Sequence, residues 1–514
     1  MNAKRWLIVG GAVTLVLAVA AVVAGRRAGP FLRGEIEQAL GERLDSVVTL
    51  ERLDVTLLPR PSITGRGLVI RHRGRTDIPP LVTVGAFRGH ASWMGALARR
   101  VADVSVDGLE VTIPPRRRDD MPSLGGGGSG AQRSTGRRDF AIDTLTATNT
   151  RLSIMPRNPE KDPRVFDIFS LEVRDLTLVS PSTFVASLTN PVPAGTIETS
   201  GSFGPWNREE PGDTPLEGRF TFDADLGTIK GIAGALDAEG QYSGPVDRIV
   251  ATGNTRTPDF SIPKLKALAL PLETTFRAVV DGTNGDVQLE QVDAKLAESL
   301  FIAKGFIVGT KGVKGKRILL DVTSRDARMA DILSFTVRSQ PPAMSGDVAL
   351  TTSFDLPQGD EDVIDKLKLA GTVTIKRARF ASDTVQDKVD DLSRRARGRP
   401  EDVSIDEVAS DITATFTMEK GRITLQDIAY AVPGANVSMR GVYGLESGAL
   451  DFAGTARLRA SVSQTQTGWK HFLLKPFDPL FRKGGAGSRL AIKVSGTVDE
   501  PKFGLDFGRT LKGK

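Results

Sequence analysis

The chain has 514 residues with a formal net charge of +6, and 54 residues are glycine and 29 are proline. It contains no cysteine, which excludes disulfides, thiolate catalysis and cysteine-ligated metals. Hydrophobic residues make up 40% and charged residues 25%, so the chain can bury a large core. Its positive charge is weakly clustered and lacks a recognition-helix or RNA-binding pattern, so no nucleic acid partner is expected.

The first segment is an apolar run from Trp6 to Gly25, in which Thr14 is the only clearly polar side chain. A helix of this length, at ~1.5 Å per residue, covers the ~30 Å hydrocarbon core and predicts a transmembrane anchor within residues 1–28. A cleaved signal peptide is the alternative, although its apolar region is usually only ~7–15 residues long. The residues expected inside the membrane are Trp6, Leu7, Ile8, Val9, Val13, Leu15, Val16, Leu17, Val19, Val22 and Val23.

An N-terminal β region, 29–115, follows the anchor. It begins with apolar residues at every fourth position over 32–44, which predicts a short amphipathic helix. Segment 52–74 reads as strands interrupted by proline and glycine, and 101–115 as two short strands around a turn at Asp107-Gly108. Residues 116–138, with a run of four glycines and several arginines, are expected to form a disordered linker.

From residue 139 onward the sequence is almost entirely strand and turn, in a central region, 139–380, and a C-terminal region, 381–514. Helices are predicted only at 325–333 and at 382–398, where Gly398 is a candidate C-terminal cap. Two helices cannot cover this much sheet. The apolar faces must therefore pack on a second sheet or line an open groove that holds an apolar ligand.

Alternation of apolar and polar residues is clearest in segments 219–226, 347–354 and 449–462. Such strands have one wet face and one face that needs a cover. Their apolar positions are the candidate floor of a groove: Phe220, Phe222, Val348, Leu350, Phe354, Leu450, Phe452, Leu458 and Val462.

Residues 467–490 break the strand pattern, because Pro476 and Pro479 exclude a regular central strand. This segment is expected either to close the end of the β structure or to contact an anionic membrane, before two final strands at 488–498 and 501–507. The residues concerned are Phe472, Leu473, Lys475, Phe477, Leu480, Phe481, Arg482 and Lys483.

No group of residues in the sequence is arranged for catalysis. His72, His90 and His471 have no second histidine at metal-binding spacing, and no His-Glu-x-x-His or Gly-x-Ser-x-Gly motif occurs. The glycine-rich segment 309–317 has the wrong spacing for a phosphate-binding loop. We therefore predict that the protein is not an enzyme and has no catalytic residue, no bound metal and no other cofactor.

Three C-terminal stretches, 386–403, 421–468 and 473–507, resemble the AsmA-like family of bacterial envelope proteins. The N-terminal anchor and the stretches "LPRPSITGRGLVI", "PPLVTVGAF" and "VSVDGLEVTIPP" resemble it too. The resemblance implies a single-pass inner-membrane protein with a cytoplasmic N-terminus and a periplasmic body. It also implies a role in outer-membrane biogenesis and kinship with bridge-like lipid-transfer proteins, whose β units form a groove with an apolar floor.

The resemblance favours the groove over packed sheets. The expected fold is mainly β: an N-terminal transmembrane helix, then an elongated, twisted antiparallel sheet that forms an open apolar groove, with a few short helices. The expected partners are membrane phospholipid, the inner membrane and an envelope protein. The alternative function is a non-enzymatic assembly factor for outer-membrane proteins that acts by strand pairing.

Overall fold

The fold is given by a computed structural model, which describes most of the chain from residue 46 to residue 505. The described residues are 34, 37–38, 41, 46–56, 60–72, 74, 76–94, 100–113, 141–156, 158–177, 179–205, 214–337, 341–402, 408–459 and 488–505. The predicted anchor, the linker 116–138 and the segment 472–483 lie outside them. Among the described residues, no helix has the length and apolar character needed to cross a membrane. Of the predicted helix at 32–44, only 34, 37–38 and 41 are described, and these are helical.

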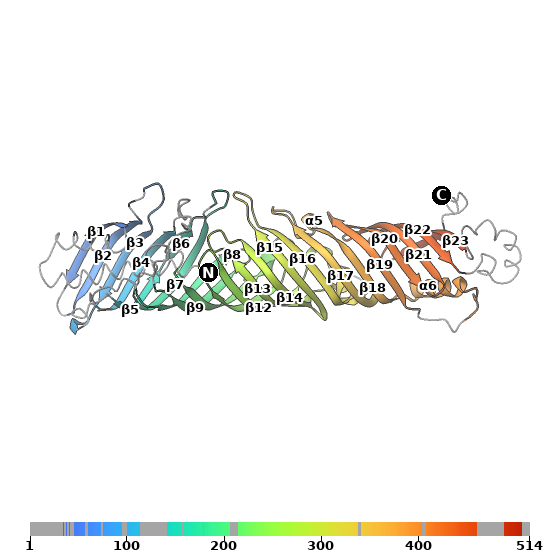
Figure 1. Cartoon of the computed structure of the whole chain (residues 1–514), viewed down its shortest axis with the longest axis horizontal. Coiled ribbons are helices and arrows are strands. Elements are labelled where there is room, and N and C mark those ends of the chain that lie inside the picture. Colours follow the sequence, from blue (N-terminus) through green and yellow to red (C-terminus); the bar gives the residue numbers. More distant parts are fainter. Residues whose placement is uncertain are drawn as a thin grey trace, which may run out of the picture.

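The described strands form one sheet of 24 strands, which confirms the prediction of a mainly β, twisted antiparallel fold. Figure 1 shows the strands in chain order along a long body, each tilted against its long axis. They are β1 (Ser46–Thr56), β2 (Ser62–His72), β3 (Val82–His90), β4 (Arg100–Ile113), β5 (Ala141–Thr148), β6 (Thr150–Ile154), β7 (Arg164–Leu176), β8 (Ser182–Pro191), β9 (Ala194–Phe203), β10 (Leu216–Asp225), β11 (Ala235–Ser243), β12 (Ile249–Phe260), β13 (Leu270–Val280), β14 (Val287–Leu296), β15 (Ser299–Val308), β16 (Arg317–Arg328), β17 (Met344–Leu356), β18 (Lys368–Phe380), β19 (Ser410–Glu419), β20 (Arg422–Val432), β21 (Ala435–Gly444), β22 (Ala449–Leu458), β23 (Ser488–Thr497) and β24 (Pro501–Leu505).

Strand order in the sheet follows the chain, and neighbours are antiparallel from β1 to β4 and from β7 to β24. The exception is β4, which runs parallel to β5 and β6. These two short strands lie end to end between β4 and β7. The described strands thus form one sheet with no second sheet facing it, and the sheet is continuous across the predicted region boundaries.

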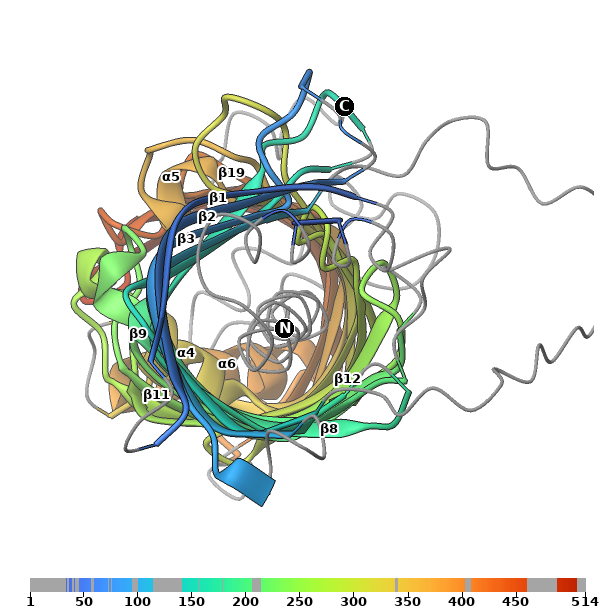
Figure 2. The same ribbon diagram turned by 90° about the vertical axis from the view of Figure 1, so that its left-hand side faces the viewer.

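Alternation along each strand divides the sheet into two faces. In β22, Leu450 and Phe452 point to one face and Asp451 and Arg457 to the other, as the sequence predicts. We call the apolar face the inner face and the polar one the outer face. Viewed along the long axis, the strands form a ring with the helices α4 (Met329–Thr336) and α6 (Asp383–Ala396) on its inside (Figure 2).

Glycines on the inner face indicate that this face is concave. A Cβ atom on Gly371 would overlap the carbonyl oxygen of Thr351 in the next strand, and one on Gly454 would overlap that of Ser438. Glycine lets a neighbouring strand approach this closely on one side, which bends the sheet toward that side.

The helices α4 and α6 both pack on the inner face. Met329 and Ile332 of α4 contact the buried Val348 and its neighbours, while Val389 and Ala396 of α6 join a second buried cluster. Helix α6 matches the predicted segment 382–398. Gly398 follows it with a φ of 72° and donates its N–H to a carbonyl of the last turn, as a C-terminal cap does.

Two local predictions were wrong. Helix α4 begins at Met329 rather than Arg325, because β16 continues through Arg328 and pairs with β17 up to that residue. The sequence 101–115 contains one strand, β4, and not two strands around a turn at Asp107-Gly108. Gly108 does have a positive φ of 66°, but there it bends β4 at the point where its parallel partner changes from β5 to β6.

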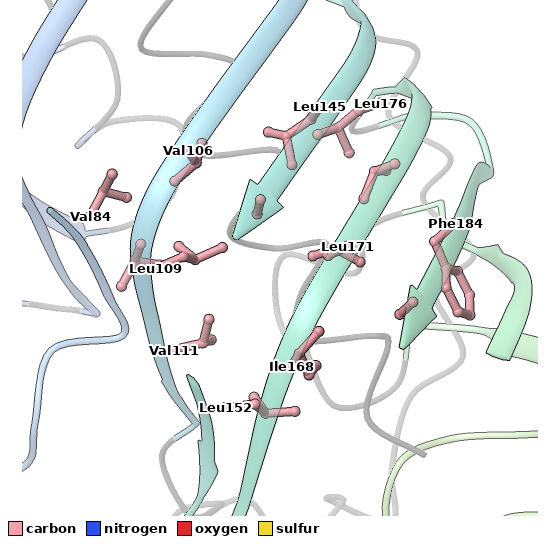
Figure 3. Packing of buried hydrophobic residues seen from close by; sticks show 14 of the residues in the cluster. Val84, Val106, Leu109, Val111, Leu145, Leu152, Ile168, Leu171, Leu176 and Phe184 are labelled. Atoms are coloured by element: carbon pink, nitrogen blue, oxygen red, sulfur yellow. The ribbon is translucent and has the colours of Figure 1, made fainter. Parts of the chain in front are cut away.

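The largest apolar core belongs to the N-terminal third of the sheet. Figure 3 shows aliphatic and aromatic side chains of β3–β8 side by side, among them Leu109, Leu171 and Phe184. Leu109 and Leu171 are each only 1% exposed. The inner face of β1–β8 is therefore almost fully buried, whereas many inner-face residues farther along the sheet are only half-buried.

Candidate functional site

The inner face of β10–β23 carries no charge at any described strand position. The register aligns Phe220 of β10 with Gly240, Gly253, Phe276 and Val292 on the following strands. The same row continues to β23 through residues that face the same way. The inner-face positions of β10–β23 are occupied by glycine, aliphatic, aromatic and methionine residues, with a few serines and threonines.

This uncharged row survives several β-bulges. At most of these bulges two polar residues in succession stay on the outer side, as at Glu290-Gln291 between Leu289 and Val292. A single inserted residue would otherwise turn the rest of the strand over, since side chains alternate with a period of two. The bulges thus bend the strands and keep the inner face apolar.

Most of the predicted floor residues are half-buried on this face: Phe220, Phe222, Leu350, Phe354, Leu450 and Phe452. Val348 and Leu458 lie beneath α4 and α6 and are 1% and 5% exposed, so they pack against helices. Val462 lies outside the described residues. The predicted residues do not meet in one pocket, because β10 and β22 are twelve strand spacings apart, or about 58 Å at ~4.8 Å each.

Aromatic rings on the inner face lie over glycines of neighbouring strands. A Cβ on Gly240 would lie 2.8 Å from the Phe220 ring, and one on Gly253 would lie 3.1 Å from the Phe276 ring. Each ring fills the space above a glycine, so the face stays smooth and apolar where the sheet bends.

Two pairs of hydroxyl groups on the inner face are hydrogen-bonded to each other, whereas the buried Tyr443 hydroxyl has no hydrogen-bond partner among the described residues. The Thr199 and Tyr242 hydroxyls are 2.7 Å apart, as are those of Thr255 and Thr274. Burial raises the pKa of Tyr242 to about 12, although its hydrogen bond with Thr199 opposes the shift. Neutral, paired hydroxyls offer little to fix a charged group.

The two long rims of the sheet meet at two places, which we call the clasps. Because the strands are antiparallel, each connection lies on one rim or the other. The first rim carries the β6–β7, β10–β11 and β12–β13 connections, and the second carries the β13–β14, β15–β16, β17–β18 and β21–β22 connections.

The first clasp joins residues 158–162 of the first rim to 281–286 and 309–316 of the second. The Lys161 Nζ lies 2.7 Å from Oδ2 of Asp286 and also donates to the Gly309 carbonyl. These two side chains are only 18% and 22% exposed. The other hydrogen bonds run from Lys311 N to Glu160 O (2.9 Å), from Lys311 Nζ to Pro159 O (2.8 Å) and from Gly312 N to Asp162 Oδ2 (2.9 Å).

Lys316 is a half-buried cation in the first clasp. Its Nζ donates to the Gly285 carbonyl. Burial, together with the nearby Arg164 guanidinium, lowers the pKa of Lys316 to about 8. The first clasp is thus held by polar contacts and contains a lysine whose charge is disfavoured.

The second clasp joins residues 226–234 and 261–268 of the first rim to 357–367 and 445–448 of the second. The segment 357–367 contains the short helix α5 (Val363–Lys366). Lys264 Nζ donates to Oδ1 of Asp365 at 2.5 Å, and the Val363 N–H donates to the Lys230 carbonyl at 3.2 Å. A buried apolar cluster lies under these contacts and includes Leu265, Val363, Ile364, Leu367 and Leu445.

The outer face has two open hollows over β8–β16. Charged side chains line both, including Glu239 and Asp293. Several of these charges are paired across strands, as Arg277 is with Glu290 at 2.7 Å. Exposed ion pairs of this kind contribute ~0.2–1 kcal/mol to stability, and they indicate a solvated surface rather than a ligand site.

The histidines do not gather in the described structure. His90 ends β3 and is exposed, His72 ends β2, and His471 lies outside the described residues. Within the part of the chain that is described, no group of three or more histidine, aspartate or glutamate residues could hold a metal ion.

No protein-family model, no curated protein and no solved structure matches this chain.

Sequence reasoning missed both clasps. The glycine-rich sequence of 309–316 does not indicate a contact across the sheet, yet these residues form part of the first clasp. A signal did exist for the second clasp: the connections 226–234 and 261–268 contain Ile229, Ile232, Ile262 and Leu265, which is unusually apolar for exposed turns. Their partners lie 100 residues or more away in the chain, as Asp365 does from Lys264, and follow no local pattern.

Proposed function

We propose that this chain is an AsmA-like protein of the bacterial cell envelope that carries phospholipid tails along its inner face. The observation behind the proposal is the inner face of β10–β23, which is uncharged and only half-buried. Each CH₂ group that leaves water contributes ~0.8 kcal/mol, so an acyl chain is stabilised anywhere along this face. No reacting side chain is needed for that task.

The apolar surface available to a ligand is confined to part of the sheet. Inner-face residues of β1–β8 are almost fully buried, whereas Phe220, Leu350 and Phe452 farther along are half-buried. The tail-binding groove in this proposal therefore runs from about β10 to β23.

The location in the proposal rests on the sequence. The apolar run from Trp6 to Gly25 anchors the chain in the inner membrane, with the N-terminus in the cytoplasm. The β body lies in the periplasm and serves outer-membrane biogenesis, as the resemblance to AsmA-like proteins implies. An envelope protein is the expected partner at one end.

A second candidate function is an assembly factor for outer-membrane proteins. Among the described strands, β1 pairs only with β2, and β24 only with β23. A free strand edge can add a strand from another protein. In that case the edges would carry the function and the inner face would be structural.

Mass spectrometry of small molecules retained by the purified full-length protein tests the first function. The wild-type protein should retain phospholipid. Leu450→Asp places a charge on the inner face and should reduce the retained lipid at least several-fold. Thr455→Asp, on the outer face of the same strand, is the matched control and should retain lipid as the wild type does. Circular dichroism checks that both variants fold. A folded Leu450→Asp protein with full lipid content would favour the assembly factor.

A further inference from the structure

The two clasps close the inner face from the side. At the first clasp, residues 158–162 of one rim are hydrogen-bonded to 309–312 of the other. At the second clasp, the Val363 N–H bonds to the Lys230 carbonyl over a buried apolar cluster. At these positions the sheet forms a closed tube and not an open groove.

A closed tube is an obstacle for a molecule with one apolar and one charged end. In an open groove, a phosphate head stays in water while the tails follow the inner face. Inside a clasp the head would have to enter the tube, where the strand positions of the inner face carry no charge and the hydroxyls of Thr199 and Tyr242 bond to each other. Burial of an unpaired phosphate there is strongly unfavourable.

The clasps are the weakest contacts around the ring. Adjacent strands are joined by ladders such as β21–β22, in which nine consecutive residues of β21 pair with β22 without a break. Each clasp instead depends on loop contacts, and the Lys264–Asp365 pair is 28% and 46% exposed. Local opening in proteins begins where buried apolar contacts are few and hydrogen bonds are exposed to solvent, so the rims separate before the ladders do.

We propose that the clasps are lateral gates, which must open to let the polar head of an amphiphile pass while its tails stay on the inner face. This inference rests on the proposed function. Headless apolar molecules need no gate, because they have no polar group that must stay in water. The first clasp, held by polar contacts, opens more readily than the second, which has an apolar cluster beneath it.

Reversible cross-linking tests the gates in a chain that has no cysteine of its own. One variant carries Lys161→Cys with Asp286→Cys, and another carries Lys264→Cys with Asp365→Cys. A short thiol-reactive cross-linker that a reductant cleaves would lock each clasp in the full-length protein. The control variant carries Lys314→Cys with Asp360→Cys. That pair is 2.7 Å apart and joins two connections of the same rim, so cross-linking it locks no gate.

The assay compares transfer of two probes between vesicles of phosphatidylethanolamine and phosphatidylglycerol. One probe is a head-labelled phosphatidylethanolamine, and the other is a pyrene-labelled alkane without a head. Locking either clasp should slow the phospholipid at least ten-fold, leave the alkane unchanged and be reversed by reductant. The cross-linked control should transfer both probes at the unlocked rate.

Other outcomes overturn the inference in distinguishable ways. Unchanged phospholipid transfer through a locked clasp would mean that heads travel inside the tube. Equal slowing of both probes would mean that the lock distorts the whole path and that the head is not what the clasp controls. Failure of the unlocked protein to transfer either probe would remove the proposed function itself, and the gates with it.

Discussion

Lys161 and Asp286 are 125 residues apart in the chain, yet the lysine Nζ lies 2.7 Å from the aspartate Oδ2. They lie on opposite rims of the same sheet, so their contact is a measure of how far the sheet has curled. Every strand ladder between them would persist if the pair separated.

A double-mutant cycle on this pair should give a coupling energy of about 1–2 kcal/mol, above the ~0.2–1 kcal/mol of exposed pairs. The reason is burial, since the two side chains are only 18% and 22% exposed. The variants are Lys161→Met and Asp286→Asn, and hydrogen exchange at the Lys311 and Gly312 amides reports opening of the clasp. The control cycle uses Lys314 and Asp360, 77% and 71% exposed, where coupling should be near zero. Equal coupling in both cycles would contradict the prediction.

The pH dependence of the first clasp should follow Lys316. Its pKa is lowered to about 8 in the folded protein from an ordinary value of 10.5. Between these values the unfolded chain binds the proton and the folded chain does not, so stability rises with pH from about 8 to 10.5. Lys316→Met removes this titration.

The melting temperature of Lys316→Met minus that of wild type should therefore fall as pH rises from 7 to 9.5, by on the order of 1–3 °C. Circular dichroism melts at each pH measure it. A difference that stays constant with pH would mean that Lys316 is not buried as a cation.

Gly371 should not tolerate a side chain. A Cβ there overlaps the Thr351 carbonyl in the adjacent strand, so Gly371→Val should cost roughly 2–3 kcal/mol. Thr372→Val changes the exposed outer position next to it and should stay within ~0.5 kcal/mol of wild type. Urea unfolding of both variants gives the comparison, and similar costs at the two positions would argue against a concave inner face.

Asp427 has a φ of 49° at a bulge between β20 and its neighbours. A β-branched residue is strained there, so Asp427→Val should cost about 1–2 kcal/mol. Asp427→Gly should be near neutral, because relief of the strained backbone offsets the greater freedom of glycine in the unfolded chain. Loss of stability in both variants would indicate that the aspartate side chain matters, and the same urea experiment distinguishes these results.

Alternation alone was enough to place Phe220, Leu350 and Leu450 on one face of a sheet, because the period of a strand is local. Most of the bulges could in principle be recognised in the sequence, since most place two polar residues in succession, as in Gln426-Asp427. Asp107-Gly108 misled because a glycine with positive φ serves a bend within β4 as well as it serves a hairpin turn.

The clasps could not be predicted in the same way. Whether Lys264 meets Asp365 depends on the accumulated twist and bending of every strand between them, and a small error at each strand moves the rims apart. The anchor at 6–25 and the segment 472–483 remain predictions, because both lie outside the described residues.

The clasps also fix how this molecule can change in length. Seven strands, β7–β13, separate 158–162 from 281–286, and seven, β11–β17, separate 226–234 from 357–367. An inserted hairpin would preserve the direction of the strands but displace the partner loops by two spacings, about 9.6 Å. Lysine side chains cannot span that displacement. Hairpins can therefore be inserted or deleted without breaking the clasps only near the ends of the body. During evolution the sheet can therefore gain or lose strands at its two ends, but not between the loops that form the clasps.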